Sequence, residues 1–325
     1  LIGEERIQYN EKTLWSGGPQ PDNTDYNGGN YQDRYKVLAE IRKALEEGNR
    51  QKAKQLAERN LVGPNNAQYG RYLSFGDIFM VFNNQKKGLE NVTDYHRGLD
   101  ISEAISTTSY TQDGTNFKRE TFSSYPDDVT VTHLSKKGDK TLDFTLWNSL
   151  TEDLIANGDY SWEYSNYKQG AVTTDSNGIL LKGTVKDNGL KFASYLGIKT
   201  DGQVTAQDGY LTVTGASYAT LLLSAKTNFA QNPKTNYRKD IDVENTVKSI
   251  VEAAKAKDYE TLKNNHIKDY QSLFNRVQLN LGGSKSSQTT KEALHTYNPE
   301  KGQKLEELFF QYGRYLLISS SRDRT

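Results

Sequence analysis

The stretch AISTTSYTQDGTNFKRETF, residues 104–122, decides the fold class of this chain. Each half follows a two-residue period, which is typical of a β-strand with one buried face. Asp113-Gly114 stands between the halves, and such a pair supplies the positive backbone φ angles that a tight hairpin turn requires. The stretch therefore predicts an antiparallel β-hairpin.

The same signals recur from about residue 72 to residue 230, with further turn pairs at Asn177-Gly178, Asp201-Gly202 and Asp208-Gly209. Many strands joined by hairpin turns, with no helices between them, are typical of antiparallel sheets packed as a sandwich. The region is too long for an immunoglobulin unit, so we predict a larger sandwich. The predicted strands are 78–82, 104–110, 116–122, 129–134, 141–147, 179–185, 191–199, 204–206, 210–214 and 219–226, and residues 6–9, before this region, alternate like a strand edge.

Helical periodicity appears on both flanks of this region. Residues 36–62 carry an apolar stripe broken at Gly48-Asn49, which predicts a helical hairpin. Two helices are expected after residue 241, the second with Asp258 as its N-cap, and then one strand at Arg276–Leu281. The last predicted helix, Lys304–Ser319, is apolar almost all round, so we expect neighbouring elements to bury it.

Composition narrows the classes of function. The 41 basic and 41 acidic side chains balance, whereas nucleic-acid binders usually carry a basic excess. The chain has no cysteine, which excludes disulfides, thiolate metal sites and cysteine nucleophiles. No apolar run of the sequence approaches the roughly 18 residues of a membrane-crossing helix. We therefore expect no nucleic-acid partner, no membrane span and no cofactor.

Adjacent carboxylates are candidates for acid–base chemistry when their surroundings separate their pKa values. Charged pairs of this kind usually lie on a solvated face, so we assign none of them to catalysis. The histidines lack the i, i+2 or i, i+4 spacing of metal ligands, so we interpret them as structural and expect no metal site. The acidic pairs are Glu4-Glu5, Asp127-Asp128, Glu152-Asp153 and Glu306-Glu307, and the histidines are His96, His133, His266 and His295.

Aromatic residues gather in the loops near the N-terminus. Trp15 lies in a Gly/Pro-rich loop, and Tyr26, Tyr31, Tyr69 and Tyr72 lie in loops rich in Asn and Asp. Aromatic faces can stack on the C–H faces of sugar rings, while amides and carboxylates bond to sugar hydroxyls. Ordinary loop packing is the alternative, and the residues alone leave both open.

Six phrases, in order along the whole chain, carry a family resemblance: ERIQYNEKTLWSGGP (5–19), YLSFGDI (72–78), YHRGLD (95–100), RETFSSYPD (119–127), HIKDYQSLFNRV (266–277) and FQYGRYLLISSSR (310–322). Together they resemble glycoside hydrolase family 95, the α-L-fucosidases. No single phrase is specific, and the order and spacing carry the resemblance.

This resemblance implies a mainly β protein with added helices: a large antiparallel β super-sandwich, a helical linker and an (α/α)6 catalytic barrel. The corresponding predicted domains are residues 1–240 for the super-sandwich with its inserted hairpin 36–62, residues 241–300 for the linker with one strand, and residues 301–325 for the start of the barrel.

The resemblance also implies inverting hydrolysis of terminal α-1,2-linked L-fucose. It assigns the general acid to a Glu and the general base to an Asp assisted by Asn side chains. In the family these groups lie in the barrel, beyond the serine-rich end of its first helix. We therefore place no catalytic residue in this chain, expect the groups to follow Thr325, and expect the chain alone to be inactive.

Loops of a sandwich can wall an active site at a domain interface. We take Asn10, Trp15, Tyr72 and Asp77 as candidate substrate-binding residues, with interdomain packing as the alternative for Trp15. The expected partners are a fucosylated oligosaccharide or glycan and the remaining (α/α)6 domain of the same protein.

Other functions stay open at this point. The chain could be a non-catalytic carbohydrate-binding module, a purely structural sandwich, or part of an α-L-galactosidase of the same family. Saturable sugar binding by the isolated chain would separate the first two. The cysteine-free composition, rich in Tyr, Asn and Lys, favours a secreted or wall-associated bacterial enzyme, and a cytoplasmic location stays open.

Overall fold

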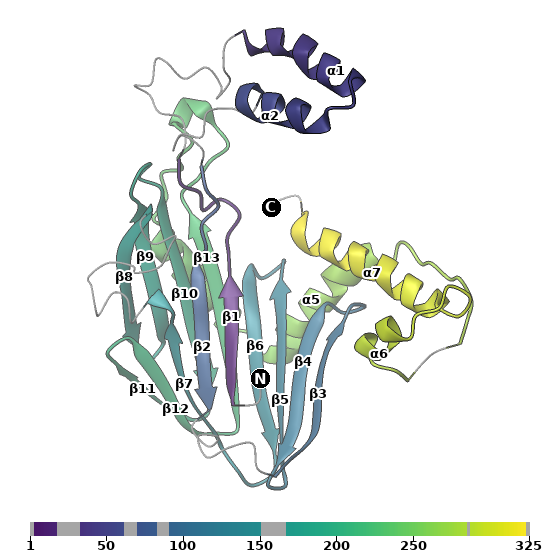
Figure 1. Ribbon diagram of the computed structural model, residues 1–325. Coiled ribbons are helices and arrows are strands. Elements are labelled where there is room, and N and C mark those ends of the chain that lie inside the picture. Colours follow the sequence, from purple (N-terminus) through teal and green to yellow (C-terminus); the bar gives the residue numbers. More distant parts are fainter. Residues whose placement is uncertain are drawn as a thin grey trace.

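Two antiparallel β-sheets pack face to face, and helices follow them along the chain (Figure 1). This arrangement confirms the predicted class, a large antiparallel β-sandwich followed by helices. No helix in the described part of the chain has both the length and the apolarity needed to cross a bilayer. The computed structural model describes residues 3–17, 33–61, 70–82, 91–150, 167–284 and 287–322.

The two sheets differ in size. In spatial order, the smaller sheet consists of β1 (Glu4–Tyr9), β2 (Gly76–Phe82), β7 (Leu142–Asn148), β12 (Tyr210–Ala216) and β11 (Gln203–Gln207). The larger sheet consists of β3 (Val92–Asp100), β4 (Ile105–Gln112), β5 (Thr115–Ser124), β6 (Val129–Lys137), β13 (Tyr218–Thr227), β10 (Lys191–Thr200), β9 (Gly178–Val185) and β8 (Lys168–Asp175).

The predicted hairpin turns use the residues that the sequence indicates. Asp113 and Gly114 join β4 to β5 with φ angles of 47° and 77°, and Asp208 and Gly209 join β11 to β12 with 50° and 81°. Both central residues of a turn with the right-handed twist of the strands need positive φ, which Asp and Gly tolerate. The turn chemistry therefore fixes the register of these two hairpins.

The main core lies between the sheets. Phe75, Phe144, Phe192, Leu146 and Leu221 are almost fully buried there. The ring of Phe75 packs edge-on against Phe192 at a centroid distance of 5.5 Å. Along the strands, inward apolar residues alternate with outward polar residues, as the two-residue period of the sequence predicts.

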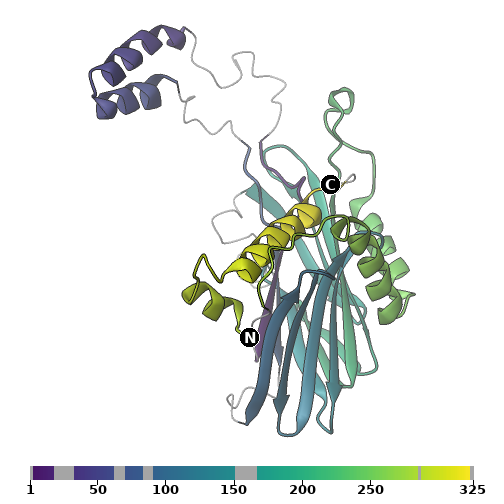
Figure 2. The same ribbon diagram turned by 90° about the vertical axis from the view of Figure 1, so that its right-hand side faces the viewer.

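Two helices, α4 (Val243–Lys255) and α5 (Tyr259–Phe274), cover the outer face of the larger sheet (Figure 2). Val247, Val251 and Leu262 face a second core on this side. Asp258 caps α5, as predicted, because its carboxylate accepts a bond from the amide of Thr261 at 2.7 Å. The linker helices are therefore part of the same packed unit as the sandwich.

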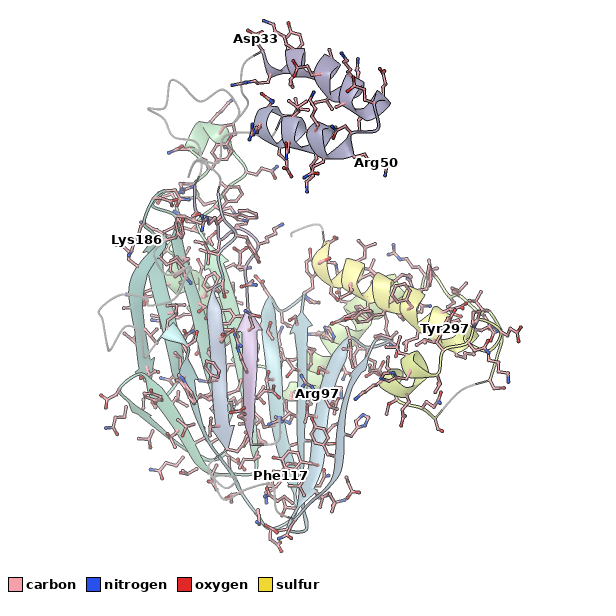
Figure 3. The ribbon with its side chains drawn as sticks, viewed as in Figure 1. Asp33, Arg50, Arg97, Phe117, Lys186 and Tyr297 are labelled. Atoms are coloured by element: carbon pink, nitrogen blue, oxygen red, sulfur yellow. The ribbon has the colours of Figure 1, made fainter. Side chains whose placement is uncertain are left out.

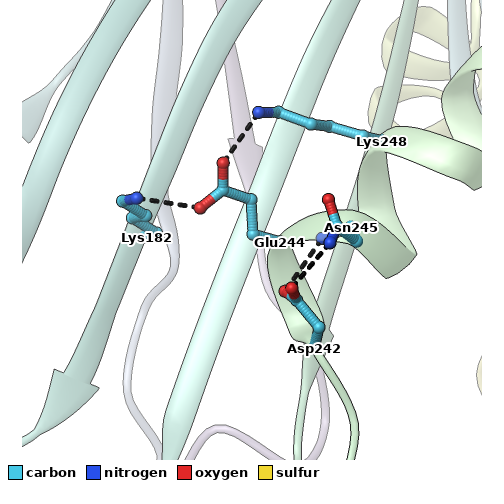
Figure 4. Close-up of polar contacts among 5 residues, drawn as sticks. All are labelled: Lys182, Asp242, Glu244, Asn245 and Lys248. Carbon is cyan, nitrogen blue, oxygen red and sulfur yellow. Dashed lines mark hydrogen bonds and ion pairs between the residues drawn. The ribbon is translucent and has the colours of Figure 1, made fainter.

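Polar contacts at the start of α4 fix the helix to the sheet (Figure 4). Asp242 caps the helix by accepting from the amide of Asn245 at 3.0 Å. Glu244 accepts from Lys182 of β9 at 2.8 Å and from Lys248 at 2.7 Å. The hydrogen bonds from Lys182 and then Lys248 lower the pKa of Glu244, so the bridge is charged at neutral pH.

The predicted helical hairpin is present as α1 (Leu38–Glu46) and α2 (Arg50–Asn60), after a 3-10 turn at Arg34–Val37. It lies beyond one end of the sandwich (Figures 1 and 2). Only Ala44 and Ala53 are buried in its two helices.

The chain after α5 holds α6 (Thr290–His295) and α7 (Gln303–Ser320). The predicted strand at Arg276–Leu281 is wrong: these residues are not in strand conformation, and they pair with none of the strands in the described part of the chain. The amide of Leu281 donates instead to Glu307 of α7 at 2.6 Å. The segment with the alternating pattern is therefore a loop that runs along the surface of α7.

Candidate substrate-facing surface

The loop after β1 and the loop before β2 run side by side and carry two of the candidate residues. Trp15 and Tyr72 form an antiparallel backbone bridge, next to which the amide of Leu73 donates to the carbonyl of Leu14 at 3.0 Å. The two ring centroids lie 5.3 Å apart, and the residues keep 47% and 41% of their surface exposed. We call this exposed aromatic pair the Trp15–Tyr72 surface.

Hydrogen bonds hold Trp15 in place. Its indole Nε1 donates to the carbonyl of Lys12 at 2.7 Å, and its own carbonyl accepts from the amide nitrogen of Asn188 at 2.9 Å. Asn188 lies in the loop after β9, near Lys186 at the end of the sandwich closest to α1 and α2 (Figure 3). Because these bonds fix both the indole and the backbone of Trp15 before any ligand arrives, little side-chain entropy would be lost on binding.

The phenol of Tyr72 is neutral. Burial raises its pKa, and the nearby charge of Glu11 raises it further. Glu11 accepts hydrogen bonds from the backbone amide and the hydroxyl of Thr13. The Trp15–Tyr72 surface can therefore stack on an apolar face of a ligand and exchange hydrogen bonds at its edge, which is chemistry for binding.

The other two candidates belong to the framework of the sandwich. Asn10 accepts a bond from the amide of Phe75 at 3.3 Å. Asp77 is 6% exposed and accepts from Arg6 of the neighbouring strand at 2.7 Å, while its amide donates to Ser149. Asn10 and Asp77 hold the loop that presents Tyr72. Of the four candidates, Trp15 and Tyr72 therefore lie together at the surface, whereas Asn10 and Asp77 form hydrogen bonds within the framework.

In each described pair of adjacent carboxylates, at least one acid forms an ion pair, and among Glu5, Asp127 and Glu307 the buried one is Asp127. Asp127 accepts hydrogen bonds from Ser124 at 2.6 Å and from Lys257 at 2.5 Å. Glu307 accepts from Lys304 at 2.8 Å, and Glu5 lies 3.5 Å from Arg119. The pair Glu152-Asp153 lies outside the described residues. A cation therefore pairs with each of these three acids.

Two of the histidines help to fix α5 on the sheet. His133 stacks on Tyr259 at 3.8 Å, and its Nδ1 shares a hydrogen bond with the hydroxyl of Thr220 at 2.9 Å. His266 Nε2 lies 2.8 Å from the carbonyl of Glu103. Burial lowers the pKa of both histidines, that of His133 to about 4, so both are neutral at pH 7. Within the described ranges, His, Asp and Glu side chains form no group of three that could hold a metal ion.

Sequence reasoning missed two arginines at the helical end of the chain, Arg314 and Arg322, which bond to α5. Both belong to the phrase FQYGRYLLISSSR, in which Arg314 interrupts the apolar stripe of the helix and Arg322 follows it. A cation in such a stripe indicates a buried partner, and this signal could have identified them.

Two family models match the chain in series. Residues 1–232 match the glycosyl hydrolase family 65 N-terminal domain, and residues 258–325 match the glycosyl hydrolase family 95 catalytic domain. The chain belongs to the glycoside hydrolases. Its N-terminal region is a family 65 N-terminal domain, and the second match confirms the resemblance to family 95.

The curated relatives of this glycoside hydrolase chain are fucosidases by name. It is 28% identical to alpha-L-fucosidase 2 of Arabidopsis thaliana over 100% of this chain and 39% of that protein. It is 29% identical to the probable alpha-fucosidase A of Aspergillus niger, over 98% of this chain and 39% of that protein. The chain thus spans about two fifths of the length of these relatives.

Among solved structures, a putative kojibiose phosphorylase from the human microbiome is similar at a TM-score of 0.47 and 11% identity. That match covers 74% of this chain and 31% of the phosphorylase.

Proposed function

We propose that this chain is the N-terminal part of an α-L-fucosidase that releases terminal α-1,2-linked L-fucose from glycans with inversion of configuration. One observation carries the proposal: the family 95 catalytic match at residues 258–325 continues a chain whose full length aligns with named fucosidases. An inverting glycosidase needs its acid and base roughly 6.5–9.5 Å apart, so that a water molecule fits between base and sugar.

In this proposal the described residues supply a scaffold, and the catalytic acid and base belong to the remainder of the (α/α)6 domain. The apolar face of α7 supports it. No residue of α7 is buried, and Phe309 and Leu317 are 77% and 64% exposed. An apolar face this extensive is suited to burial against further helices of the same domain. The 325-residue chain alone is then inactive.

The Trp15–Tyr72 surface is our proposed contribution of the sandwich to substrate contact. Two fixed and exposed aromatic rings suit the C–H face of a sugar, and the Tyr72 phenol and Glu11 suit its hydroxyls. The same exposure also favours a second candidate function, a carbohydrate-binding module that acts without the catalytic domain. Packing of Trp15 against the catalytic domain is the remaining alternative.

The function is tested by incubating the complete enzyme with 2′-fucosyllactose and following the anomeric protons of the product by NMR. The proposal predicts that β-L-fucose appears first and then mutarotates. Release of the α anomer, or preference for an α-L-galactoside over the fucoside, would contradict the proposed mechanism or specificity.

The Trp15–Tyr72 surface is tested by titrating fucosylated oligosaccharides into the isolated 325-residue chain in a calorimeter. Saturable binding that disappears in Trp15→Ala supports a binding module. If the isolated chain does not bind and the complete enzyme with Trp15→Ala has a raised KM, the Trp15–Tyr72 surface forms part of the wall of the active site. A complete enzyme with Trp15→Ala and unchanged KM would contradict any role in substrate contact.

We further propose that the enzyme acts outside a bacterial cell or on its wall, where glycans are accessible. The support is the analogy with glycan-degrading enzymes together with the composition, namely the absence of cysteine and the abundance of Tyr, Asn and Lys. Detection of the protein in the culture medium or the wall fraction tests it, and recovery only from the cytoplasm would contradict it.

A further inference from the structure

Arg314, in the middle of α7, caps the end of α5. Its guanidinium donates to the carbonyl of Phe274, the last residue of α5, at 2.8 Å, and to the carbonyl of Val277 at 2.8 Å. It also lies over the ring of Phe274 at 4.9 Å. The last carbonyls of a helix lack partners within the helix and carry partial negative charge, so a cation there binds α7 to α5.

Arg322, two residues beyond the end of α7, makes a second connection. One guanidinium nitrogen lies 2.8 Å from each carboxylate oxygen of Asp269 in α5. The guanidinium also lies 4.1 Å from the ring centre of Tyr125, which belongs to the turn between β5 and β6. The side chains of Arg322 and Asp269 are only 14% and 23% exposed. Arg322 therefore joins α7, α5 and the sandwich at one point.

The same β5–β6 turn also holds the first half of α5. Asp127 of this turn binds Lys257, just before α5, and Asn265 in the helix donates to it at 3.3 Å. The turn thus contacts α5 through Asp127, and it contacts Arg322 through Tyr125. Through this turn, the large sheet is a common reference point for α5 and α7, two of the helices within the family 95 catalytic match.

We propose that Arg322 is a positioning residue of the enzyme: it fixes, against Tyr125 and Asp269, the place and direction in which the chain leaves α7. This inference rests on the proposed fucosidase function. The structure gives α7 no buried residue. It is held on α5 by the edge-on contact of Tyr315 with Tyr270, at a centroid distance of 6.4 Å, and by polar attachments. Arg322 provides the attachment at the end of α7, and the sandwich thereby sets the orientation of the catalytic domain.

The geometry requires arginine. A planar guanidinium can lie flat on the Tyr125 ring and donate to the Asp269 carboxylate at the same time, whereas an ammonium group is a point charge without a stacking face. Lysine at position 322 would keep the ion pair and lose the stacking. The charge-preserving Arg322→Lys is therefore expected to restore only part of the function that Arg322→Gln loses.

The test combines two measurements on Arg322→Gln and Arg322→Lys, with Arg276→Gln as the matched control. Arg276 lies just after α5, is exposed, and its guanidinium donates to a carbonyl four residues earlier, that of Ser272, at 2.7 Å. In the 325-residue chain, hydrogen exchange of the amides in residues 303–320 is compared by mass spectrometry. We expect about tenfold faster exchange in Arg322→Gln, an intermediate rate in Arg322→Lys, and no change in Arg276→Gln.

In the complete enzyme, kcat and KM are measured at a temperature where circular dichroism finds every variant folded. We expect kcat of Arg322→Gln to fall about 10–100-fold with KM changed less than about threefold, because a misplaced catalytic group costs rate more than binding. Unchanged exchange in Arg322→Gln overturns the inference, and so does faster exchange with unaltered kcat. If the wild-type enzyme released no fucose, the proposed function would fail, and the exchange measurement alone would decide the role of Arg322 in fixing α7.

Discussion

Asp127 and Asp128 are neighbours in the sequence with opposite surroundings. The side chain of Asp127 is 1% exposed and binds Lys257, whereas that of Asp128 is 53% exposed and binds Lys226. The expectation from the sequence, a solvated face for such acidic pairs, describes Asp128 alone. A Pro-Asp-Asp turn pattern reports backbone conformation, and it carries no information about the helix that covers one carboxylate.

This difference predicts different costs of neutralisation. Asp127→Asn removes the charge of a buried carboxylate that accepts hydrogen bonds from Ser124 and Lys257, and we expect it to lower the free energy of unfolding by about 2 kcal/mol. Asp128→Asn removes an exposed pair and should cost less than about 0.5 kcal/mol. Urea denaturation of both variants of the 325-residue chain measures the two effects. Equal costs would contradict the burial of Asp127.

His133 predicts a dependence of stability on pH. Its pKa in the fold is about 4 because of burial, below the ordinary 6.5, so the unfolded chain binds its proton more readily. The stabilising contribution of the neutral ring is therefore complete above pH 6.5 and is lost as pH falls from 6.5 to 4. At this partly exposed site, solvent screening limits the loss to about 1–2 kcal/mol.

His133→Asn keeps an acceptor for Thr220 and removes the titration. Unfolding free energies at pH 6.5 and pH 4 should therefore differ less in His133→Asn than in the wild type. If acid lowered the stability of both proteins equally, the neutral histidine under Tyr259 would not be the cause.

At the scale of elements, the strands that the sequence analysis missed are the two edges of the large sheet, β3 and β8. The central strands carry buried residues on both faces, whereas β3 has none and β8 only Lys168, so the apolar signal is weak at the edges. The error at Arg276–Leu281 has the opposite cause. Its polar and apolar residues alternate as in a strand, but the segment pairs with none of the described strands. Alternation indicates burial on one side, and pairing depends on distant parts of the chain.

The contact between α4 and β10 predicts the effect of adding one methyl group. A Cβ on Gly197 of β10 would lie 2.5 Å from Val251 Cγ1 of α4. Gly197→Ala should therefore move the helix and cost about 1–3 kcal/mol of unfolding free energy.

Gly313→Ala is the control for that substitution, since nothing lies within 4 Å of the added carbon in α7. Alanine also favours the helix there by about 0.5–1 kcal/mol. Thermal unfolding of both variants of the 325-residue chain compares them. A Gly197→Ala variant as stable as Gly313→Ala would contradict the close packing of α4.

At the scale of the whole molecule, the sequence predicted the succession of sheets and helices because turn pairs and periodicities are local signals. The Trp15–Tyr72 pair was also accessible from the sequence, since both aromatics stand in polar loops. The contacts made by Arg314 and Arg322 were not, because their partners on α5, on the segment after it and on the sandwich lie 37 to 197 positions away along the chain. Local patterns identify the elements, and long-range polar contacts determine how the elements are oriented.

Because one face of α7 is exposed, we expect a substitution on it to affect the 325-residue chain and the complete enzyme differently. Phe309→Lys should leave the stability of the 325-residue chain unchanged and reduce its self-association, because Phe309 is 77% exposed. In the complete enzyme it should lower the unfolding free energy by about 3 kcal/mol, the cost of losing a buried Phe. Tyr35→Lys, at a residue 67% exposed outside α7, is the control. Equal effects of both substitutions in both proteins would contradict the docking of α7.

The central claim is that these residues form the scaffold of a fucosidase whose chemistry is completed by further helices. Its most direct test is fucose release from 2′-fucosyllactose, measured for the 325-residue chain and for the complete protein at equal molar concentration. The account predicts release by the complete protein and none by the chain. Release by the chain alone, or none by the complete protein, would contradict it.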